Sequence, residues 1–466
     1  MRSNIVKDMR QAIEASGLQS GMTVSFHHHL RNGDYVLDMV MREIARLGIR
    51  NLRVAVSSVF PAHSCLVELM QQGVVTRLDT NYMSGDVAEA VCQGVLDEPV
   101  MFRTHGGRPR AIEAGELHID VAFIAAPSVD AMGNISGVHG DSACGSLGYC
   151  KPDARYAERV VAVTDSLTDA VFEHVAVDHS HIDYIVQVDS IGDAAGIVSG
   201  TTRVTRDPVG LVIAEYAAKC IEAAGLLYDG FNFQTGAGGA SLAGAMFVRE
   251  RMRALGIQGG YLLGGVTGFF VDMLEEGLFQ NIYDVQCFDL PAVASMLRNP
   301  AHHEVSASQY ASPARKDALV NGLDAVLLGA TEIDFNFNVN VHTDSNGNIM
   351  GGSGGHSDAA AGAGMTIVVA PLLRARLPIV VDSVGVISTP GTTVDVFVTE
   401  YGVAVNPART DLKEQFAAFG IPQFDIHDLH SKALSIAGVP VRRPKGTREV
   451  AIVEYRDGTV LDTIAV

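Results

Sequence analysis

The chain repeats part of itself at one constant offset, and this limits the folds it can adopt more than any other feature. Residues 13–18 (Ile-Glu-Ala-Ser-Gly-Leu) recur at 221–226 as Ile-Glu-Ala-Ala-Gly-Leu. The tripeptide Leu-Gly-Ile at 47–49 recurs at 255–257, so both shifts (221 − 13 and 255 − 47) equal 208 residues. In each copy a Gly follows an amphipathic pattern where a helix is expected to end.

Two later pairs extend the repeat. Residues 130–137 and 344–351 share the pattern Asp-x-x-Gly-Asn-Ile-x-Gly, which is typical of a tight turn between two strands. Residues 182–186 and 394–398 are predicted to be equivalent late strands. Several matches in the same order indicate a tandem duplication, with the join near residues 200–210.

Each half alternates predicted strands and helices. In the first half, strands at 23–26 and 52–56 are followed by helices at 35–47 and 64–72. The chain has 466 residues, of which 47% are hydrophobic, so it can bury large cores. We therefore predict an α/β protein with two tandem, duplicated open α/β domains, at residues 1–205 and 206–466.

Composition and charge exclude several classes of protein. The net charge of −19 argues against a nucleic-acid partner, and an anionic substrate would need a local cluster of cations or amides. No apolar run approaches the roughly 18 residues of a membrane span, and the N-terminus has no signal-peptide core. The six cysteines form no Cys-x-x-Cys pair, so we expect reduced thiols and a cytoplasmic location without a membrane partner.

A glycine-rich run, Gly-Gly-Ser-Gly-Gly at 351–355, carries the strongest functional signal. It lies between a predicted strand at 332–342 and a predicted helix at 359–364. Glycines without Cβ atoms let several amides converge on one anionic oxygen, so we predict an oxyanion nest at Gly352, Gly354 and Gly355. The tightly flanking apolar segments disfavour a flexible linker.

A second glycine-rich loop at 236–241 follows a predicted strand at 231–233 and precedes a predicted helix near 242–254. Its spacing is not Gly-x-Gly-x-x-Gly, and no acidic residue follows at the expected strand end, so a nicotinamide site is not indicated. We interpret it as a loop that contacts phosphate or pantetheine, through Gly236, Gly238, Gly239 and Ser241.

Two polar motifs in the first half are candidates for anion binding. Consecutive residues cannot easily share one ion, so His27-His28-His29 next to Arg31 favours an anion over a metal; hydrogen-bonded structural histidines are the alternative. The stretch 103–110 (Arg-Thr-His-Gly-Gly-Arg-Pro-Arg) suits carboxylates or phosphates. A solvated basic turn is an equal alternative for Arg108 and Arg110. The predicted anion ligands in this stretch are Arg103, His105, Gly106 and Gly107.

Glu304 follows two histidines, at residues 302 and 303. A carboxylate in such surroundings can act as a nucleophile or as a general base. A surface ion pair is the alternative that residue chemistry alone favours.

Several of these motifs together resemble those of the citrate lyase alpha subunits, over nearly the whole chain. The matching segments are 24–31, 104–108, 142–149, 233–243, 284–290, 349–358 and 398–407. The resemblance implies two coenzyme A transferase-type α/β domains. It also implies a transferase reaction in which citrate displaces acetate from an acetyl thioester on an acyl carrier protein.

The resemblance further implies partners and a division of the site. The thiol belongs to a coenzyme A-derived group on a separate gamma subunit, for which free coenzyme A thioesters can stand in, and a beta subunit cleaves the citryl thioester. A homo-oligomer is expected, with neither a metal nor a tightly bound cofactor. The implied citrate ligands are His27, His28, His29, Arg31, Arg103, His105, Gly106 and Gly107. The implied contacts of the coenzyme A-derived group are Gly236, Gly238, Gly239, Ser241, Ser353 and His356.

The resemblance leaves the role of Glu304 open. Glu304-Val305-Ser306 occupies a position similar to the Glu-Ile-Ser of acetate-type coenzyme A transferases, whose glutamate forms a covalent glutamyl–coenzyme A intermediate. The segment from Glu304 to Glu332 is longer here, and citrate lyase alpha subunits are usually assigned direct transfer through a mixed anhydride. Sugar-phosphate isomerases and non-catalytic sensors of related fold are the alternatives from other classes.

Overall fold

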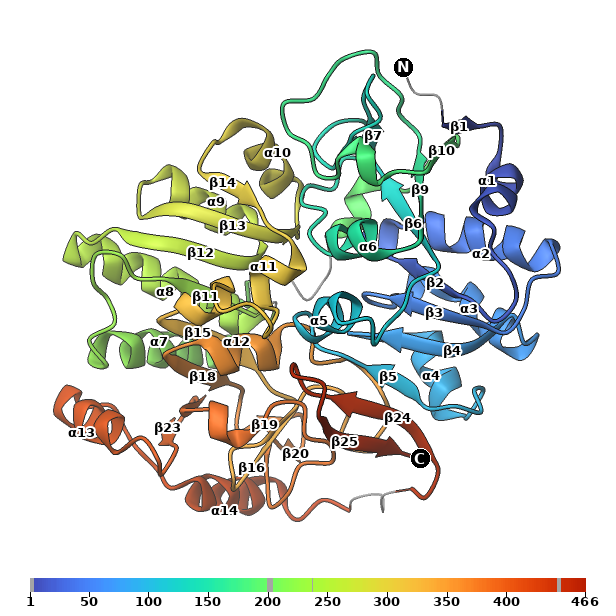
Figure 1. Cartoon of the computed structure of the whole chain (residues 1–466). Helices are drawn as coiled ribbons and strands as arrows, with labels where there is room; N and C mark the ends of the chain where they lie inside the picture. Colours follow the sequence, from blue (N-terminus) through green and yellow to red (C-terminus); the bar gives the residue numbers. More distant parts are fainter. Residues whose placement is uncertain (1–3, 199–203, 237, 442–445) are drawn as a thin grey trace.

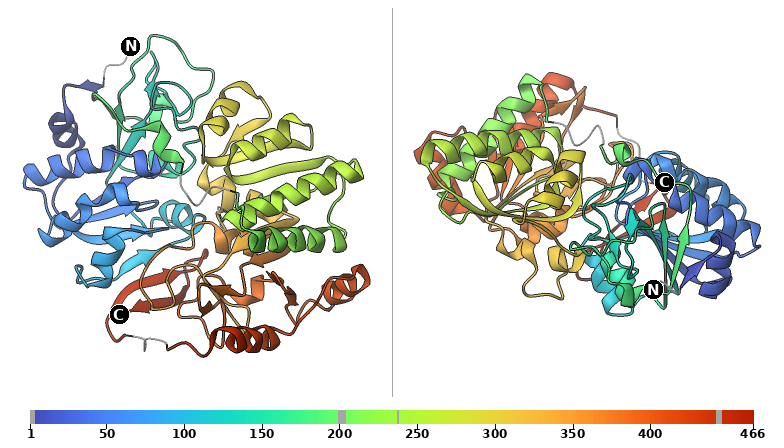
Figure 2. Two further views of the ribbon diagram at one scale, coloured as in Figure 1. Left: turned by 180° about the vertical axis from the view of Figure 1, so that it is seen from behind. Right: turned by 90° about the horizontal axis from the view of Figure 1, so that it is seen from above.

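Two large sheets lie side by side, each covered by helices (Figures 1 and 2). The structure is a computed structural model that describes residues 4–198, 204–236, 238–441 and 446–466. The predicted join near 200–210 falls partly outside these residues. None of the described helices combines the length and the hydropathy of a membrane span. All six cysteines are free thiols.

The first sheet is parallel except at its C-terminal edge. Its strands, in spatial order, are β1 (Ile5–Val6), β10 (Tyr184–Gln187), β9 (Arg159–Thr164), β6 (Val121–Ala126), β2 (Thr23–Phe26), β3 (Leu52–Val56), β4 (Val75–Thr80), β5 (Val100–Phe102), β24 (Glu449–Glu454) and β25 (Val460–Ala465). The second sheet runs β14 (His302–Glu304), β13 (Phe279–Cys287), β12 (Gly259–Val266), β11 (Phe233–Thr235), β15 (Ala325–Gly329), β18 (Met365–Val369), β22 (Val396–Thr399) and β23 (Gly402–Val405).

The duplication is confirmed by strand order. The first sheet contains the series β10-β9-β6-β2-β3-β4-β5, and the second contains β22-β18-β15-β11-β12-β13-β14. Both series follow the same order along the chain, with every neighbouring pair parallel. The predicted late strands correspond to β10 and β22. The structure therefore confirms both the α/β fold class and the repeat.

The helices pack on the sheets. They are α1 (Met9–Ser16), α2 (Val36–Arg46), α3 (Cys65–Gln71), α4 (Asp86–Cys92), α5 (Gly107–Glu113), α6 (Cys150–Tyr156), α7 (Pro208–Ala223), α8 (Gly239–Leu255), α9 (Gly268–Glu275), α10 (Leu290–Arg298), α11 (Ala307–Ala311), α12 (His356–Gly362), α13 (Thr410–Phe419) and α14 (Ile426–Ala437). The repeated glycines at 17, 48, 225 and 256 have φ of 74°, 76°, 70° and 67°, which is the left-handed conformation that ends a helix.

The predicted strand at 332–342 is wrong. This segment is a hairpin of β16 (Glu332–Asp334) and β17 (Val339–Asn340), which pairs with β21 (Val380–Val381) in a small sheet. The Asp334 carboxylate accepts the backbone N–H groups of Asn336 and Asn338 and turns the chain between the two strands.

The predicted match of residues 130–137 with 344–351 is therefore wrong as a structural equivalence. The hairpin β7 (Ser128–Val129) and β8 (Ile135–Ser136) follows β6 just as β16 and β17 follow β15, so Asp130 corresponds to Asp334. Phe337, with φ of 63°, takes the left-handed place of Gly133, with φ of 99°. The turn at Asp344 has the same local bonds elsewhere in the fold.

The C-terminal hairpin returns to the first sheet. Strand β24 pairs in parallel with β5, and β25 pairs antiparallel with β24, so the last strands lie beside the first half (Figure 1). The division into domains at 1–205 and 206–466 stays a prediction, although sheet membership assigns β24 and β25 to the first half. One buried apolar core contains side chains from both halves.

Candidate active site

The predicted oxyanion loop lies in the contact between the two halves. The N–H of Met83 donates to the carbonyl of Gly351 (3.2 Å), and the N–H of Gly354 donates to the carbonyl of Asn81 (3.2 Å). A Cβ atom added to Gly352 would lie 2.3 Å from the Asn81 oxygen. Glycine is needed because this backbone presses directly on the chain that follows β4.

Most amides of this loop already bind protein acceptors. The N–H of Gly351 donates to the carbonyl of His342, the N–H of Ser353 to Nε2 of His342 (3.3 Å), and the N–H of Gly354 to Asn81. Among the described residues of the loop, the amides of Gly352 and Gly355 are therefore the ones left for the predicted oxyanion nest.

His105 meets the loop from the first half. The backbone N–H of His105 donates to the carbonyl of Gly354 (2.8 Å), and a Cβ atom on Gly354 would lie 3.3 Å from Nε2 of His105. Burial, with a smaller contribution from Arg108, lowers the pKa of His105 to about 3. The imidazole is therefore neutral near pH 7 and brings a hydrogen-bonding group, not a charge, to the loop.

The predicted anion ligands His28 and His29 lie in a buried ring stack with His105 and Tyr149. Ring centroids are 5.9 Å apart for His28 and His105, and 4.5 Å for His105 and Tyr149. Burial lowers the pKa of both His28 and His29 well below the usual value. Nδ1 of His28 also bonds the Ser57 hydroxyl (2.6 Å). This geometry favours the alternative of hydrogen-bonded structural histidines.

His27 and Arg108 share one buried carboxylate. Arg108 donates two hydrogen bonds of 2.7 Å to Asp153, and His27 Nε2 lies 3.2 Å from the same group. Burial raises the pKa of Asp153, but Arg108 and His27 outweigh it, and the pKa falls below its usual range. Arg108 therefore does not belong to a solvated turn. Its ion pair with Asp153 joins α5 to α6.

Arg103 and Arg31 are also held by protein groups. Arg103 forms ion pairs with Asp79 and with Glu454 (3.3 Å), which link β4, β5 and β24. The Arg31 guanidinium lies 5.1 Å from the ring centroid of Phe60 and 4.8 Å from that of Phe288. The structure therefore supports a structural role for Arg103, and citrate binding by either arginine stays a prediction.

One carboxylate joins three segments at the interface. Asp358, in α12, accepts from the Thr104 hydroxyl (2.9 Å) and from the N–H of Gly106 (2.9 Å), and lies 3.4 Å from Nε of Arg456. Burial, partly offset by Arg456, raises the pKa of Asp358 to about 6. The backbone N–H of Gly107 likewise donates a hydrogen bond, to the hydroxyl of Thr104. Gly106 and Gly107 therefore fix the loop and helix α5 in place.

Ser353 and His356 form hydrogen bonds within the second half. Nε2 of His356 donates to the carbonyl of Gly329 (2.8 Å), so its Nδ1 is the acceptor from the Thr389 hydroxyl (2.7 Å). Burial lowers the pKa of His356 to about 4. The hydroxyls of Ser353 and Ser357 are 2.9 Å apart. These bonds orient the glycine-rich loop.

The loop at 236–241 connects β11 to α8. Strand β11 begins two residues later than the predicted strand, and α8 begins three residues earlier than the predicted helix. The N–H of Gly236 donates to Leu327 (2.7 Å), Gly238 precedes the helix, and Gly239 is its first residue. Ser241 is buried, and its hydroxyl has no hydrogen-bond partner among the described residues. Residue 237 lies outside the described residues, and contact with a coenzyme A-derived group stays a prediction.

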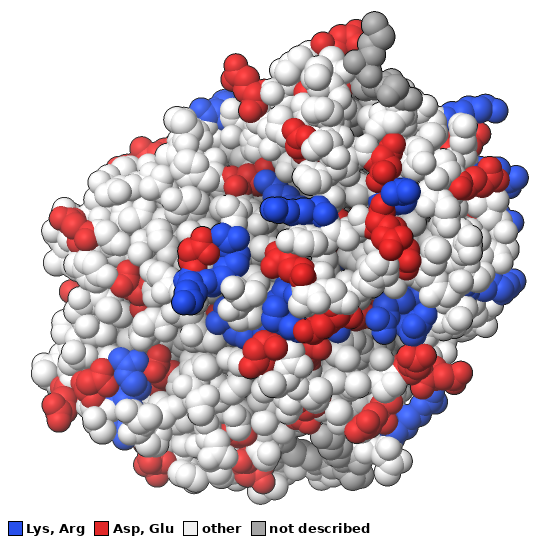
Figure 3. Space-filling view, viewed as in Figure 1, with Lys and Arg blue, Asp and Glu red and all other residues white. Residues whose placement is uncertain are grey.

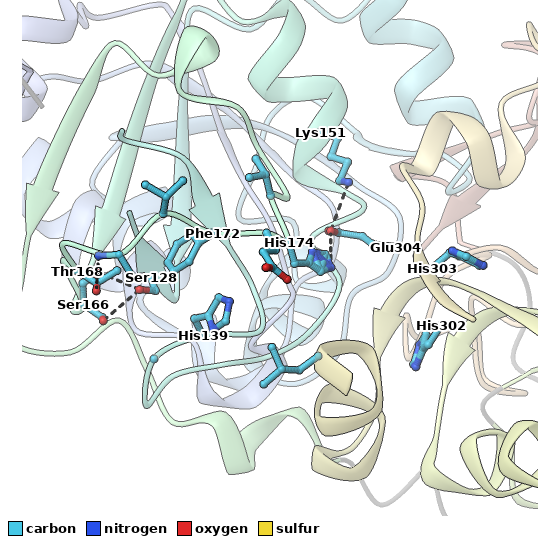
Figure 4. A pocket seen from close by; sticks show the side chains of 16 residues that line it. Ser128, His139, Lys151, Ser166, Thr168, Phe172, His174, His302, His303 and Glu304 are labelled. Atoms are coloured by element: carbon cyan, nitrogen blue, oxygen red, sulfur yellow. Dashed lines mark hydrogen bonds and ion pairs between the residues drawn. The ribbon is translucent and has the colours of Figure 1, made fainter. Parts of the chain in front are cut away.

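Glu304 is not a surface residue. It ends β14, opposite Asp284 of β13, and the short helix α11 follows it. Its Oε1 accepts the N–H of Leu147 (2.6 Å), while Oε2 lies 3.4 Å from Nζ of Lys151 and 3.5 Å from Nε2 of His174. All three donors belong to the first half, so the carboxylate is held across the junction (Figure 4).

Glu304 lines a cavity of about 910 Å³ between the halves, a volume within the range of ligand sites. One wall comes from loops of the first half and the other from β14 and α10. Its lining residues are Ser128, His139, Gly140, Lys151, Ser166, Thr168, Ala170, Val171, Phe172, Glu173, His174, Val175, Leu297, His302, His303 and Glu304. On the face in Figure 3, basic and acidic side chains interleave along this junction.

Sequence reasoning missed Lys151 and His174. Lys151 lies two residues after the segment 142–149, which was notable only for its resemblance, and His174 lies in irregular chain without a pattern. Among the described residues one trio, His118, Asp120 and Glu158, could hold a metal ion. It precedes β6 and β9, at the end of the sheet opposite to the cavity.

Known proteins match the chain along nearly all of its length. A family model described as "Citrate lyase, alpha subunit" matches residues 2–466. The citrate lyase alpha chain of Haemophilus influenzae is 47% identical over 456 residues, which cover 98% of this chain and 91% of the relative. That of Escherichia coli K12 is 46% identical over 457 residues, with coverage of 98% and 90%.

Solved structures agree. A citrate lyase alpha subunit from Streptococcus mutans, in complex with citrate, has a TM-score of 0.97 and 47% identity, with coverage of 100% of this chain and 92% of that one. A malonate decarboxylase alpha subunit from Acinetobacter baumannii has a TM-score of 0.67 at 15% identity, covering 93% and 92%, and shows a shared fold.

The raised pKa of Asp358 predicts a pH-dependent stability. Between about pH 4 and 6 the folded protein keeps a proton that an unfolded carboxyl has lost, so this residue's contribution to the free energy of unfolding falls as pH rises. Asp358→Asn should remove that slope. Thermal unfolding at several pH values measures it, with the exposed Asp141→Asn as control. An unchanged slope in Asp358→Asn would contradict the assignment.

Proposed function

Because the chain belongs to the family of citrate lyase alpha subunits, we propose that it exchanges acetate for citrate on a thioester. The thioester is carried by the coenzyme A-derived group of an acyl carrier subunit, or by coenzyme A itself. The products are the citryl thioester and acetate. The proposal includes gamma and beta subunits as partners, a homo-oligomeric assembly and a cytoplasmic location.

The observation that carries the proposal is the placement of Glu304. A carboxylate with both oxygens held by the first half lies on the wall of an interdomain cavity that can admit a thioester and an acid together. Exchange between an acid and a thioester requires these two to meet, with a donor for the oxyanion that forms on the carbonyl. Gly352 and Gly355 are not among the residues that line this cavity, so their role as oxyanion donors stays a prediction.

We favour direct attack by citrate. A citrate carboxylate oxygen attacks the carbonyl carbon of the acetyl thioester. The carbon–sulfur bond breaks, the thiolate is released, and a mixed anhydride of citrate and acetate forms. The thiolate then attacks the citryl carbonyl and expels acetate. Glu304 suits a supporting role in this scheme, because hydrogen bonds and ion pairs to both of its oxygens weaken it as a nucleophile.

The proposed exchange is tested with purified protein, acetyl coenzyme A and citrate. We expect citrate-dependent loss of acetyl coenzyme A, with acetate and citryl coenzyme A as products by mass spectrometry. No exchange with either coenzyme A or the acyl carrier thioester would overturn the proposal.

Substitution of Glu304 separates direct attack from covalent catalysis. Glu304→Gln should slow exchange by about 10²-fold without abolishing it, because the uncharged amide no longer holds Lys151 and His174 in place at the cavity wall. Kinetics should be sequential. Intact-mass spectrometry after exposure to acetyl coenzyme A alone should find no adduct. A coenzyme A adduct on Glu304, with ping-pong kinetics, would establish the covalent route instead.

The glycine-rich loop predicts a matched pair of variants. Gly354→Ala places a Cβ atom 3.3 Å from His105 at a φ of 51°, which should displace the loop and lower turnover by about 10²-fold. Gly347→Ala imposes similar backbone strain, at a φ of 86°, with no atom within 4 Å. It should keep turnover near wild type. Equal effects on the two turnover numbers would mean that the loop's position does not matter.

A further inference from the structure

We propose that Lys151 and His174 bind a carboxylate of the polycarboxylate acceptor, in the cavity beside Glu304. The inference rests on the proposed function and names the residues that would select its acid substrate. Both side chains come from the first half, Lys151 from α6 and His174 from the chain between β9 and β10.

The two side chains converge on one oxygen and also open into the cavity. Nζ of Lys151 and Nε2 of His174 lie 3.4 Å and 3.5 Å from Oε2 of Glu304, longer than the usual 2.7–2.9 Å of a charge-assisted hydrogen bond. Each is 24% exposed, whereas Glu304 is 4% exposed. Figure 4 shows them approaching the carboxylate from different sides. They can therefore contact a second anion without leaving Glu304.

Other candidate cations of the first half are held by protein groups or are neutral, and the Arg31 guanidinium stacks on the rings of Phe60 and Phe288. Arg103 and Arg108 bind the carboxylates of Asp79 and Asp153, and burial lowers the pKa values of His28 and His105. Lys151 is the one lysine or arginine among the described residues that line the cavity. In a chain of net charge −19, an anion entering this cavity meets its positive charge at Lys151.

The position beside Glu304 explains why a cation is needed there. Two carboxylates about 4 Å apart repel each other strongly where water is partly excluded. A shared ammonium group offsets this repulsion and keeps the acceptor close to Glu304. When the cavity holds no acid, Glu304 keeps Lys151 directed into it.

An anionic group of the thioester-bearing molecule is the other possible ligand of these two side chains, so the test compares the two substrates. Lys151→Ala should raise the KM for citrate at least about tenfold, which corresponds to the loss of one charge-assisted contact. The KM for acetyl coenzyme A should change less than twofold. Lys219→Ala, which removes a surface lysine paired with Glu215 on α7, serves as control and should leave both KM values unchanged.

A larger rise in the KM for acetyl coenzyme A, or no change in either KM, would overturn the inference. Titration calorimetry with citrate alone separates it from the proposed function, because it needs no turnover. Wild type should bind citrate and Lys151→Ala should bind it at least about tenfold more weakly; equal binding, or none by wild type, would refute the assignment. If Lys151→Ala does not fold, as judged by circular dichroism, His174→Ala carries the same two measurements.

Discussion

The carboxylate of Asp358 holds together the parts of the molecule on which the site depends. It accepts hydrogen bonds from Thr104 and Gly106 of the first half and pairs with Arg456 of the C-terminal hairpin. Asp358 lies three residues after Gly355, so its bonds also fix the start of α12 and the end of the glycine-rich loop. They act together with the other hydrogen bonds across the junction, such as those of Gly354 with Asn81 and His105 and of Glu304 with Leu147.

The charged side chains of the first half serve two purposes: some hold the fold together, and others lie at the cavity. Two buried arginines of the first half, Arg103 and Arg108, are paired with Asp79 and Asp153, and these pairs bridge strands and helices. Buried histidines in the same region lose their proton to desolvation and act as packed, hydrogen-bonding rings. What is left for an anionic ligand is the partly exposed Lys151, on the wall of the cavity.

The repeat made much of the fold predictable. A constant offset located equivalent helix ends, and the left-handed glycines at 48 and 256 bear this out. The hairpin at 332–342 was missed because its alternating apolar residues imitate a single strand, and the turn depends on Asp334 capping two amides. Phe337 adopts a positive φ that its residue type disfavours, so no local pattern indicates the reversal.

The candidate site was less predictable for a different reason. Glycine density located the loop at 351–355, and the two histidines before Glu304 drew attention to that residue. The partners of Glu304, however, lie 157 residues away at Leu147 and similarly far at Lys151, and sequence spacing carries no information on such contacts. Likewise, an arginine paired with Asp79 and one free to bind a substrate look identical in a sequence.

The return of β24 to the edge of β5 sets an order of events during synthesis. The first sheet can assemble as soon as its early strands leave the ribosome, yet its edge at β5 stays uncovered until more than three hundred further residues have been made. Arg456 arrives with those last strands. A nascent chain therefore cannot complete the junction between its halves before Arg456 has been synthesised.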